Sequence, residues 1–583
     1  MSEARIRWIS GPVMRAGTRD VFHVYEAVAV GPRALLGEVI KLDGDDFVAQ
    51  IYEDTTGLKP GDAVTGTGRP LSIALGPGIL GTICDGLLRP LDAVHGAFIQ
   101  PGARSKPNRR FDFAPTVKQG DRVQAGESIG TIATPRAQLC LMPPRSAPGV
   151  VRWIAPAGQY TDEETVCRVE HEGGAMREIA LAHPWPVREP RPVSERLAIA
   201  GPMITGQRIL DTLFPVGRGS RAALPGGFGT GKTVLQEALA KWSDADIIVY
   251  VGCGERGNEM SEVLDELPKL QDPRTGHALM ERTVIIANTS NMPVAAREAS
   301  IYTAITVAEY FRDQGLHVAL MADSTSRWAE ALREVSGRLE ELPGEAGYPA
   351  YLSSRLAQFY ERAGRMRTLA GTEGSVTIIG AISPPAGDFT EPVTMHTRRC
   401  VRAFWALDRG RAQARFYPAI HPLQSYSADV DALARWWQTQ DNPDWSAQRK
   451  RLLELLEAQS RLERMSRIVG KDALSPAQQL TLLCADLVND AILRQSSFSE
   501  VDRYCSPQRQ TEILKIVIRF IDQARSAVEA GVHPDKIAEL PIRRTLQRIG
   551  EEFGEAKIPE IRGLWKQLDA EFSSLTQSPA NAG

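Results

Sequence analysis

The chain has 583 residues, more than a single hydrophobic core normally supports, so several domains are expected. Lys plus Arg number 68 against 71 Asp plus Glu, and this near-balance argues against a protein that binds nucleic acid. The seven cysteines show no metal-ligand or redox spacing, which favours reduced thiols in a cytosolic compartment. No run approaches the roughly 18 apolar residues of a membrane helix, so we expect no transmembrane segment.

Two β-rich stretches are predicted in the first third of the chain. Residues 1–70 alternate apolar and polar in short runs broken by Gly and Pro, which predicts an antiparallel β-barrel. Residues 111–185, around VKQGDRVQAGESIGTI, resemble the hairpins of biotinyl and lipoyl carrier domains. Those domains carry their cofactor on a lysine at a hairpin tip, and the segment LMPPRSAPGVV has no lysine. We therefore interpret 111–185 as a structural insertion and expect no covalent cofactor.

Residues 71–110 and 186–430 are predicted to form an α/β domain. Short, nearly continuous apolar runs are typical of parallel strands buried on both faces, and they lie at 247–251, 284–287, 318–322 and 376–379. A helical apolar face between Ala295 and Ala308, ended by Gly315, lies between two of these runs. Strand signals fade beyond 430, and a helical period from Leu452 to Val469 predicts a helical domain over 431–583.

A complete phosphate-binding motif lies in the α/β domain. Residues 226–233, GGFGTGKT, match G-x-x-x-x-G-K-[ST], after an apolar segment and before a helix-like run. The glycines allow backbone N–H groups to surround phosphate oxygens, and the helix start adds a partial positive charge. Lys232 would reach the β- and γ-phosphates, and the Thr233 hydroxyl would hold Mg²⁺. A plain glycine-rich turn is the alternative. We expect the nucleotide to contact Gly226, Gly227, Phe228, Gly229, Thr230, Gly231, Lys232, Thr233 and Val234.

Two acids follow buried strands of the same domain. Glu255 comes after the run IIVYVG, and an acid that emerges from such a strand can serve as the base for an attacking water. Asp323 ends the strand HVALMAD and could hold Mg²⁺ directly or through a water. The alternatives are a solvated turn residue for Glu255 and a helix cap for Asp323.

The segment GCGERGNEM, together with the phosphate loop, resembles the catalytic A subunits of vacuolar and archaeal-type rotary ATPases. The likeness covers nearly the whole chain, including GLKPGDAVTGTGRPLSIALGPGILGTICDG, the insertion, SPPAGDFTEPV and the helical end. It is more distant to the β subunit of F-type ATP synthase. The resemblance implies an N-terminal antiparallel β-barrel, a β-rich insertion, a RecA-like P-loop α/β domain and a C-terminal α-helical bundle.

The resemblance also implies roles for individual residues. Glu255 would polarise the lytic water, and Arg256 would help to hold the γ-phosphate. Arg327, in the segment STSRW, would lie near the phosphates, although a structural ion pair is equally compatible with it. The family stacks adenine between two aromatics, which fall on Tyr417 in RFYPAIHPL and Phe498 in LRQSSFSEVD. Core packing is the alternative for both.

The chain departs from the family at two positions of the loop. Thr230 stands where vacuolar relatives typically carry cysteine and archaeal relatives often carry serine. Gly227 stands where relatives often show Pro or Ala. The loop therefore indicates a prokaryotic variant without a thiol, and the roles of Gly227 and of Glu259 stay open.

As a function, the resemblance implies a catalytic subunit that hydrolyses or forms ATP with Mg²⁺. Three copies would alternate with three of a homologous, non-catalytic B subunit in a ring that surrounds a central rotor stalk, beside a peripheral stalk. Turnover would be coupled to H⁺ or Na⁺ movement through a separate membrane sector, contacted only indirectly, at the cytoplasmic face of a prokaryotic membrane. The sequence identifies neither the coupling ion nor whether synthesis or hydrolysis of ATP dominates.

Three alternatives are weighed against this interpretation. A homohexameric secretion or flagellar export ATPase shares the α/β core, but the insertion and the segment GCGERGNEM argue against this alternative. A non-catalytic ring subunit would lack the loop lysine or the catalytic glutamate, whereas this chain has Lys232, Glu255 and Asp323 together. An RNA translocase is disfavoured by the charge balance and by the absence of a basic, aromatic-rich strand surface in the sequence.

Overall fold

The structure, a computed structural model, describes residues 2–91, 101–102, 109–134, 138–142, 148–171, 173–272, 275–470 and 473–577. The chain divides into two compact units. The first unit is built from Met1–Ala198, Ala245–Pro384 and Phe389–Cys400. The second unit is built from Ile199–Asp244, Pro385–Asp388 and Val401–Gly583.

The first unit begins with a closed antiparallel barrel. Its strands follow the order β1-β2-β5-β4-β3-β6 around the barrel. Ile6, Val28 and Phe47 are among the side chains buried inside it, because alternate residues of each strand point inward. The strands are β1 (Glu3–Ser10), β2 (Val13–Thr18), β3 (Glu26–Val30), β4 (Leu35–Asp43), β5 (Asp46–Ile51) and β6 (Ala63–Pro70).

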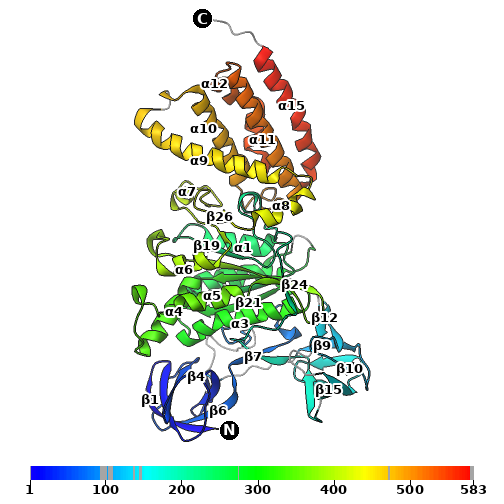
Figure 1. The fold of residues 1–583 in the computed structure, drawn as a ribbon, viewed down its shortest axis with the longest axis vertical. Coiled ribbons are helices and arrows are strands. Elements are labelled where there is room, and N and C mark those ends of the chain that lie inside the picture. The colour runs from blue at the N-terminus through cyan, green and yellow to red at the C-terminus, as the bar shows by residue number, and fades with distance from the viewer. Residues whose placement is uncertain are drawn as a thin grey trace. The chain divides into compact units, whose positions relative to one another are not determined.

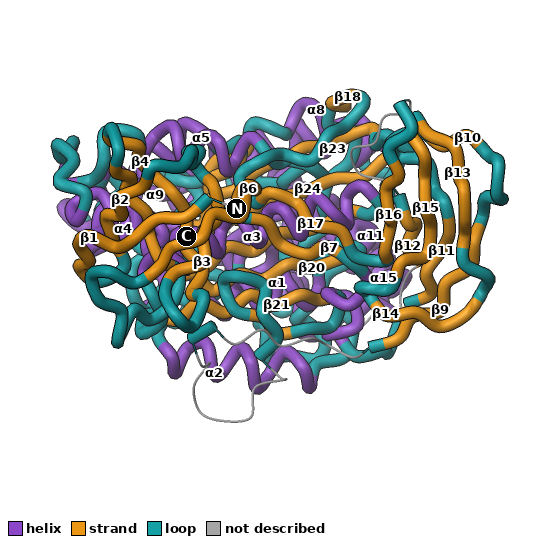
Figure 2. The backbone as a smooth tube through the Cα atoms, turned by 90° about the horizontal axis from the view of Figure 1, so that it is seen from below, coloured by secondary structure: helices purple, strands orange, loops and turns teal. Residues whose placement is uncertain are grey.

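The predicted insertion contains two four-stranded sheets, whose strands lie side by side in Figure 2. One sheet has the order β10-β13-β15-β16 and the other β12-β11-β9-β14. Residues 143–147 of the segment LMPPRSAPGVV lie outside the described residues. The strands are β9 (Arg110–Pro115), β10 (Arg122–Val123), β11 (Gly130–Ala133), β12 (Gln138–Leu141), β13 (Gly149–Ile154), β14 (Gly158–Thr161), β15 (Thr165–His171) and β16 (Met176–Ala180).

The α/β part of the first unit is a parallel sheet in the order β24-β22-β20-β21-β8. Its long strands are buried almost throughout because helices cover them, and α3 (Val294–Asp313) packs on β20, β21, β22 and β24. Gly315, with φ +80°, follows the end of α3. The strands are β8 (Ile83–Cys84), β20 (Ile247–Glu255), β21 (Thr283–Thr289), β22 (His317–Asp323) and β24 (Glu373–Ile382).

Shorter elements complete the first unit. Strand β7 pairs with β17, and β23 pairs with both β18 and β24. The bounds of these strands are β7 (Ser72–Leu75), β17 (His183–Pro186), β18 (Glu195–Leu197) and β23 (Gly364–Arg367). The remaining helices are α2 (Gly257–Glu266), α4 (Thr325–Arg338), α5 (Leu352–Glu361) and α6 (Pro392–Cys400).

The second unit joins a short β segment to the helical domain. Strand β19 (Arg221–Pro225) is followed by α1 (Lys232–Trp242) and pairs in parallel with β25 (Ala403–Phe404), which pairs with β26 (Tyr426–Ser427). The other helices, yellow to red in Figure 1, are α7 (Arg409–Gln413), α8 (Val430–Gln438), α9 (Trp445–Val469), α10 (Pro476–Val488), α11 (Pro507–Glu529), α12 (Pro534–Ala538), α13 (Pro541–Gln547), α14 (Ile549–Glu552) and α15 (Ile558–Gln577).

The apolar face predicted over Leu452 to Val469 is buried only in part. Leu452 is buried, Leu455, Ala458 and Leu462 are partly buried, and Met465 near the end of α9 is exposed. The helical period is therefore correct, but only the first half of the face packs against its neighbours. In the part of the chain that the structure describes, no helix has the length and apolar character needed to cross a bilayer.

Candidate active site

The predicted phosphate loop connects β19 to α1 in the second unit. Gly229 and Gly231 adopt φ of +75° and +80°, which side-chain-bearing residues rarely adopt. The buried Thr230 hydroxyl donates to the Gly227 carbonyl oxygen at 2.8 Å and so closes the turn from within. A Cβ on Gly226 would lie 2.6 Å from the Thr230 hydroxyl oxygen, so only glycine fits there without a shift.

Lys232 and Thr233 form the first turn of α1, and both are partly exposed to solvent. The first turn of a helix leaves backbone N–H groups without intrahelical partners and carries a partial positive charge. The Phe228 side chain is exposed at the tip of the loop. Backbone donors, an ammonium group and a hydroxyl therefore gather at one helix N-terminus, an arrangement suited to a phosphate chain.

A cavity of about 800 Å³ lies beside the loop, within the second unit. Gly231 and Val234 line it from the loop, and Tyr417 and Phe498 line it from two distant parts of the sequence. Tyr417 is 42% exposed and Phe498 is 91% exposed, so neither ring is packed in the core. An open cavity with two accessible aromatic rings can accept a flat aromatic group such as a nucleobase.

Residues 494–502, which carry Phe498, are held by a buried polar network. The Arg208 guanidinium donates to the Asp502 carboxylate and to the Arg494 carbonyl oxygen. The Gln495 side-chain amide donates to the carbonyl oxygens of Gly206 and Asp502, both at 2.8 Å. Its oxygen accepts the Arg208 backbone N–H at 2.7 Å. The segment is thereby fixed while the Phe498 ring stays exposed.

Glu255 lies at the carboxyl end of β20 in the first unit and is 9% exposed. The strand is irregular there, since its register to β21 shifts between Cys253 and Glu255 and Gly254 has φ +72°. Such bulges redirect side chains at strand ends. A Cβ on Gly254 would lie 2.7 Å from Arg297 Cδ and 2.8 Å from Arg327 Cβ. Both arginines therefore pack against the strand end that carries Glu255.

Asp323 ends β22, the strand next to β20, in register with Gly252. Its carboxylate is buried, and the Tyr250 hydroxyl donates to Asp323 Oδ2 at 3.3 Å. The carboxyl ends of parallel strands meet at one edge of a sheet, so Glu255 and Asp323 belong to the same edge. Ligands bind at this edge in open α/β sheets.

The two predicted arginines differ in their surroundings. Arg256 is exposed at the N-cap of α2, and Glu259 lies in the first turn of the same helix. Arg327 forms an ion pair with Glu330 at 2.9 Å on α4. The hydrogen bond to Glu330, and further the charges of Glu330, Glu255 and Glu259, raise the pKa of Arg327. Arg327 thus has an ion pair within its own helix and lies close to two acids of the motif, and its place near the phosphates stays a prediction.

The predicted residues fall into two groups by unit. The loop residues Gly226 to Val234, Tyr417 and Phe498 belong to the second unit, where the cavity brings several of them together. Glu255, Arg256, Asp323 and Arg327 belong to the first unit, at or directly after the ends of β20 and β22.

Known proteins match the chain along most of its length. The family models that match are the ATP synthase alpha/beta family beta-barrel domain (residues 6–68), the ATPsynthase alpha/beta subunit barrel-sandwich domain (105–188), the ATP synthase alpha/beta family nucleotide-binding domain (206–427) and the C-terminal domain of V and A type ATP synthase (434–538). The A subunit of the A-type ATP synthase of Methanopyrus kandleri is 49% identical over 98% of both chains. The corresponding protein of Thermococcus onnurineus is also 49% identical, over 98% of this chain and 99% of its own.

The chain belongs to the family of A-type ATP synthase A subunits. This membership confirms the predicted fold class and the resemblance on which it rested. The assembled ATPase EscN of the enteropathogenic E. coli type III secretion system aligns with a TM-score of 0.64, covering 88% of this chain and 100% of its own. Its identity is 23%, so it shares the fold alone.

Sequence reasoning missed several groups around the site of this A-type family member. Gln495, Arg208 and Asp502 hold the segment with Phe498, and Tyr250 contacts Asp323. The polar residues that flank Phe498 in LRQSSFSEVD are a signal that could have indicated Gln495 and Asp502. Tyr250 lies inside the apolar run IIVYVG, and Arg208 lies outside every motif, so the sequence gives no signal for either residue.

Proposed function

We propose that this chain is the catalytic subunit of a rotary ATPase of the A type, which hydrolyses or forms ATP. One observation carries the proposal: Gly229 and Gly231 of the phosphate loop and two accessible aromatic rings line one cavity within the second unit. ATP or ADP would place its phosphates on the loop and its base between Tyr417 and Phe498. Membership in the A-type family supports both the reaction and its coupling to ion movement.

The site residues take roles that fit their chemistry. Lys232 would contact the β- and γ-phosphates, and Glu255 would orient and deprotonate the attacking water. Arg256 would hold the γ-phosphate, and Arg327 would shape the site through its contact with Glu330. Burial keeps the thiol of Cys253 out of this chemistry, because it raises the Cys253 pKa to about 12.

Mg²⁺ fits the donors that the chain offers. The Thr233 hydroxyl and the Asp323 carboxylate are hard oxygen ligands, which Mg²⁺ prefers together with phosphate oxygens and water. The bound ion would neutralise charge that develops on the phosphates. The described residues include no cluster of three or more His, Cys, Asp or Glu side chains that could hold a metal. A nucleotide-dependent ion needs no such cluster.

The assembly follows from the same proposal. Three copies of the chain would alternate with three copies of a homologous, non-catalytic B subunit in a ring that surrounds a central rotor stalk, with a peripheral stalk outside. The complex would act at the cytoplasmic face of a prokaryotic membrane, and H⁺ or Na⁺ would cross a separate membrane sector. ATP-driven ion uptake by the intact complex, measured with and without sodium, identifies the ion. Ion uptake that does not depend on ATP would contradict the coupling of ATP turnover to ion movement.

Lys232→Ala tests the proposal at the loop. The substitution removes a charge that touches both ground and transition states, so Mg-ATP affinity and turnover should fall together. Lys241→Ala is the matched control, because Lys241 lies at the other end of α1 and contacts Trp242. Calorimetry should show weakened Mg-ATP binding only for Lys232→Ala. Equal affinity in wild type and Lys232→Ala would contradict the assignment of the loop.

A further inference from the structure

A second cavity, of about 560 Å³, lies in the first unit, apart from every residue assigned above to nucleotide turnover. It is bounded by the segment 188–196, by α3 and α5, and by Met366 of β23. Its unusual feature is the number of guanidinium groups. The arginines that line it are Arg188, Arg191, Arg196, Arg312, Arg355 and Arg362.

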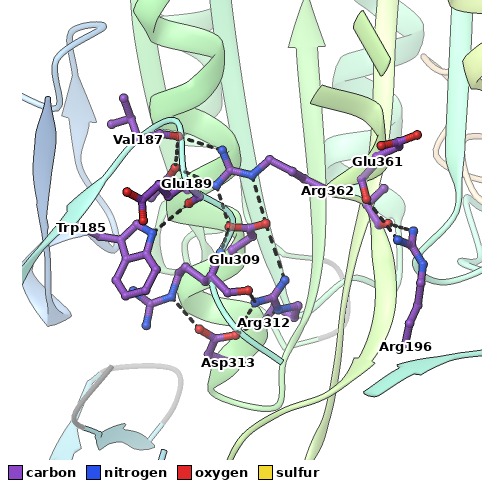
Figure 3. A network of polar contacts seen from close by, with 12 residues as sticks. Trp185, Val187, Glu189, Arg196, Glu309, Arg312, Asp313, Glu361 and Arg362 are labelled. Carbon is purple, nitrogen blue, oxygen red and sulfur yellow. Dashed lines mark hydrogen bonds and ion pairs between the residues drawn. The ribbon is translucent and has the colours of Figure 1, made fainter. Parts of the chain in front are cut away.

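Four of these arginines are neutralised by buried carboxylates. Figure 3 shows Arg362 paired with Glu309, at 2.6 Å, and Asp313 next to Arg312. Asp313 also accepts from Arg191 at 2.6 Å. The fourth, Arg188, pairs with both Glu38 and Glu298 at 2.9 Å. These pairs form a rigid wall in which each buried charge has its counter-ion, as buried charges require.

Arg355 is different, because no carboxylate among the described residues pairs with it. Its guanidinium lies 5.6 Å from the centroid of the Tyr351 ring and close to Tyr302. Arg188 lies 4.9 Å from the centroid of the same Tyr302 ring. The partly buried Arg355 thus lies beside a second cation and has no carboxylate of the described residues in an ion pair with it, so its charge is compensated only in part, by Glu298, with which Arg188 is already paired.

The Tyr302 hydroxyl supplies an independent observation. The side chain is 3% exposed and lines the cavity, and the Arg355 guanidinium lies beside its hydroxyl, whose own O–H proton has no acceptor among the described residues. A buried hydroxyl proton without an acceptor costs free energy, so such protons usually have one. A ligand in the cavity would provide one.

The mouth of the cavity carries one charge of each sign. Arg196 is exposed and donates to the carbonyl oxygens of Glu361 and Ala363, the first at 3.2 Å (Figure 3). Glu361 is also exposed there and adds a carboxylate. Six arginines thus line the cavity, and five carboxylates either line it or form ion pairs with these arginines. The arginines therefore exceed the carboxylates by one.

We propose that this cavity binds a small oxyanion, of the class of phosphate or the phosphoryl group of a small metabolite. Arg355 is its principal ligand, the Tyr302 hydroxyl donates a hydrogen bond, and Arg196 draws the anion in at the mouth. The planar guanidinium fork matches the geometry of phosphate oxygens, and the volume lies within the usual range of small-molecule sites. The paired arginines of the wall keep these ligands in place.

Inorganic phosphate is the probe for the test. Because the phosphate loop also binds phosphate, the full chain is used in a Lys232→Ala background, and phosphate is titrated at constant ionic strength against chloride. Saturable binding that ATP does not displace is expected. Arg355→Gln should weaken phosphate binding about tenfold or more, as the loss of a charge-assisted hydrogen bond does.

Three further variants sharpen the result. Tyr302→Phe removes one oxygen and leaves the packing, and it should weaken phosphate binding by a few-fold. Arg196→Gln, at the exposed mouth, should do the same without endangering the fold. Arg367→Gln removes the same charge from β23 at a residue paired with Glu195 outside the cavity, and it should bind phosphate as the parent does.

The proposal is overturned if the parent chain shows no saturable phosphate binding beyond the chloride control. It is also overturned if Arg355→Gln and Tyr302→Phe bind phosphate as tightly as the parent, or if Arg367→Gln weakens binding as much as they do. None of these results touches the proposed ATP turnover, which is tested by Mg-ATP affinity at the loop in the other unit.

Discussion

Gly231 of the phosphate loop lies against the ring of Tyr417, so that a Cβ on Gly231 would lie 3.1 Å from Tyr417 Cε1. The glycine at the N-cap of α1 is thus in contact with the aromatic residue assigned to the base. The phosphate and base ends of the proposed nucleotide site are consequently built on one packed unit. A change at this glycine should therefore disturb both ends together.

Gly231→Ala should weaken Mg-ATP binding and lower turnover. The residue has φ +80°, which costs a side-chain-bearing residue roughly 1–2 kcal/mol, and the new methyl group would also press on Tyr417. Gly227→Ala is the control, because a Cβ there meets only Gly387, at 3.8 Å. Calorimetry on both variants checks this. Equal affinities in the two variants would show that the contact with Tyr417 has no role.

Glu255→Gln should lower turnover by about 10²-fold or more while nucleotide binding survives. Glutamine keeps the size and hydrogen bonding of the side chain but removes the base. The control is Glu266→Gln, the same change at an exposed residue that ends α2. Steady-state kinetics of the assembled enzyme give the comparison. Near-normal turnover in Glu255→Gln would remove Glu255 from the mechanism.

Tyr417→Ala and Phe498→Ala should each raise KM more than they lower kcat. Stacking on the base helps the bound substrate and the transition state about equally, so its loss appears mainly in binding. Both rings are exposed in the cavity, and we expect both variants to fold. Trp153→Ala, which removes a similarly exposed ring from the insertion, should leave KM unchanged. A variant that loses stability but keeps its KM would identify its ring as a packing residue.

The fold class could be predicted because several local signals agreed. The apolar runs at 247–251 and 318–322 lie inside β20 and β22, and Gly315 ends α3, since buried strands and helix ends depend on nearby residues. The burial of α9 could not be predicted in the same way. Met465 continues the helical period of Leu452, but whether a face is covered depends on distant segments.

The candidate site likewise combines residues with local sequence signals and residues placed by distant segments. Motif residues such as Lys232 and Glu255 carry their signal in adjacent residues, whereas Arg208 and Gln495 act through partners almost 300 positions away. The arginine cavity is the extreme case, because its ion pairs join residues up to 150 positions apart. No sequence window contains both partners of such a pair, so only the folded chain shows which charges are compensated.

Glu309→Gln should destabilise the first unit by about 3–5 kcal/mol, because it leaves the buried Arg362 without its counter-ion. Burial alone raises the pKa of Glu309, but Arg362 holds it below the ordinary value. This stabilisation is therefore present at neutral pH and is lost as the pH falls through the lowered pKa. Calorimetric unfolding at neutral pH should show a lower transition temperature.

The control for this variant is Glu334→Gln, which breaks an exposed pair with Arg338 and should cost less than about 1 kcal/mol. At a pH below the lowered pKa of Glu309, wild type and Glu309→Gln should approach the same stability. A difference that persists unchanged into acid would show that the charge of Glu309 is not what stabilises the unit.

The chain alone should be a poor ATPase. Phosphoryl transfer spreads negative charge over the γ-phosphate oxygens, and P-loop enzymes often stabilise it with an arginine finger worth about 10³-fold or more. The chain's own candidates belong to the rigid core of the first unit: Arg256 occupies the N-cap position of α2 directly after β20, and Arg327 is paired with Glu330 on α4. A rotary enzyme needs a site that switches with the gap between neighbouring subunits, so we expect the decisive arginine to come from the B subunit. ATP turnover by the purified chain should therefore be several hundred-fold or more below that of the chain reconstituted with its B partner. If the isolated, non-oligomeric chain matches the reconstituted ring within a few-fold, the arginine that completes the site lies in this chain.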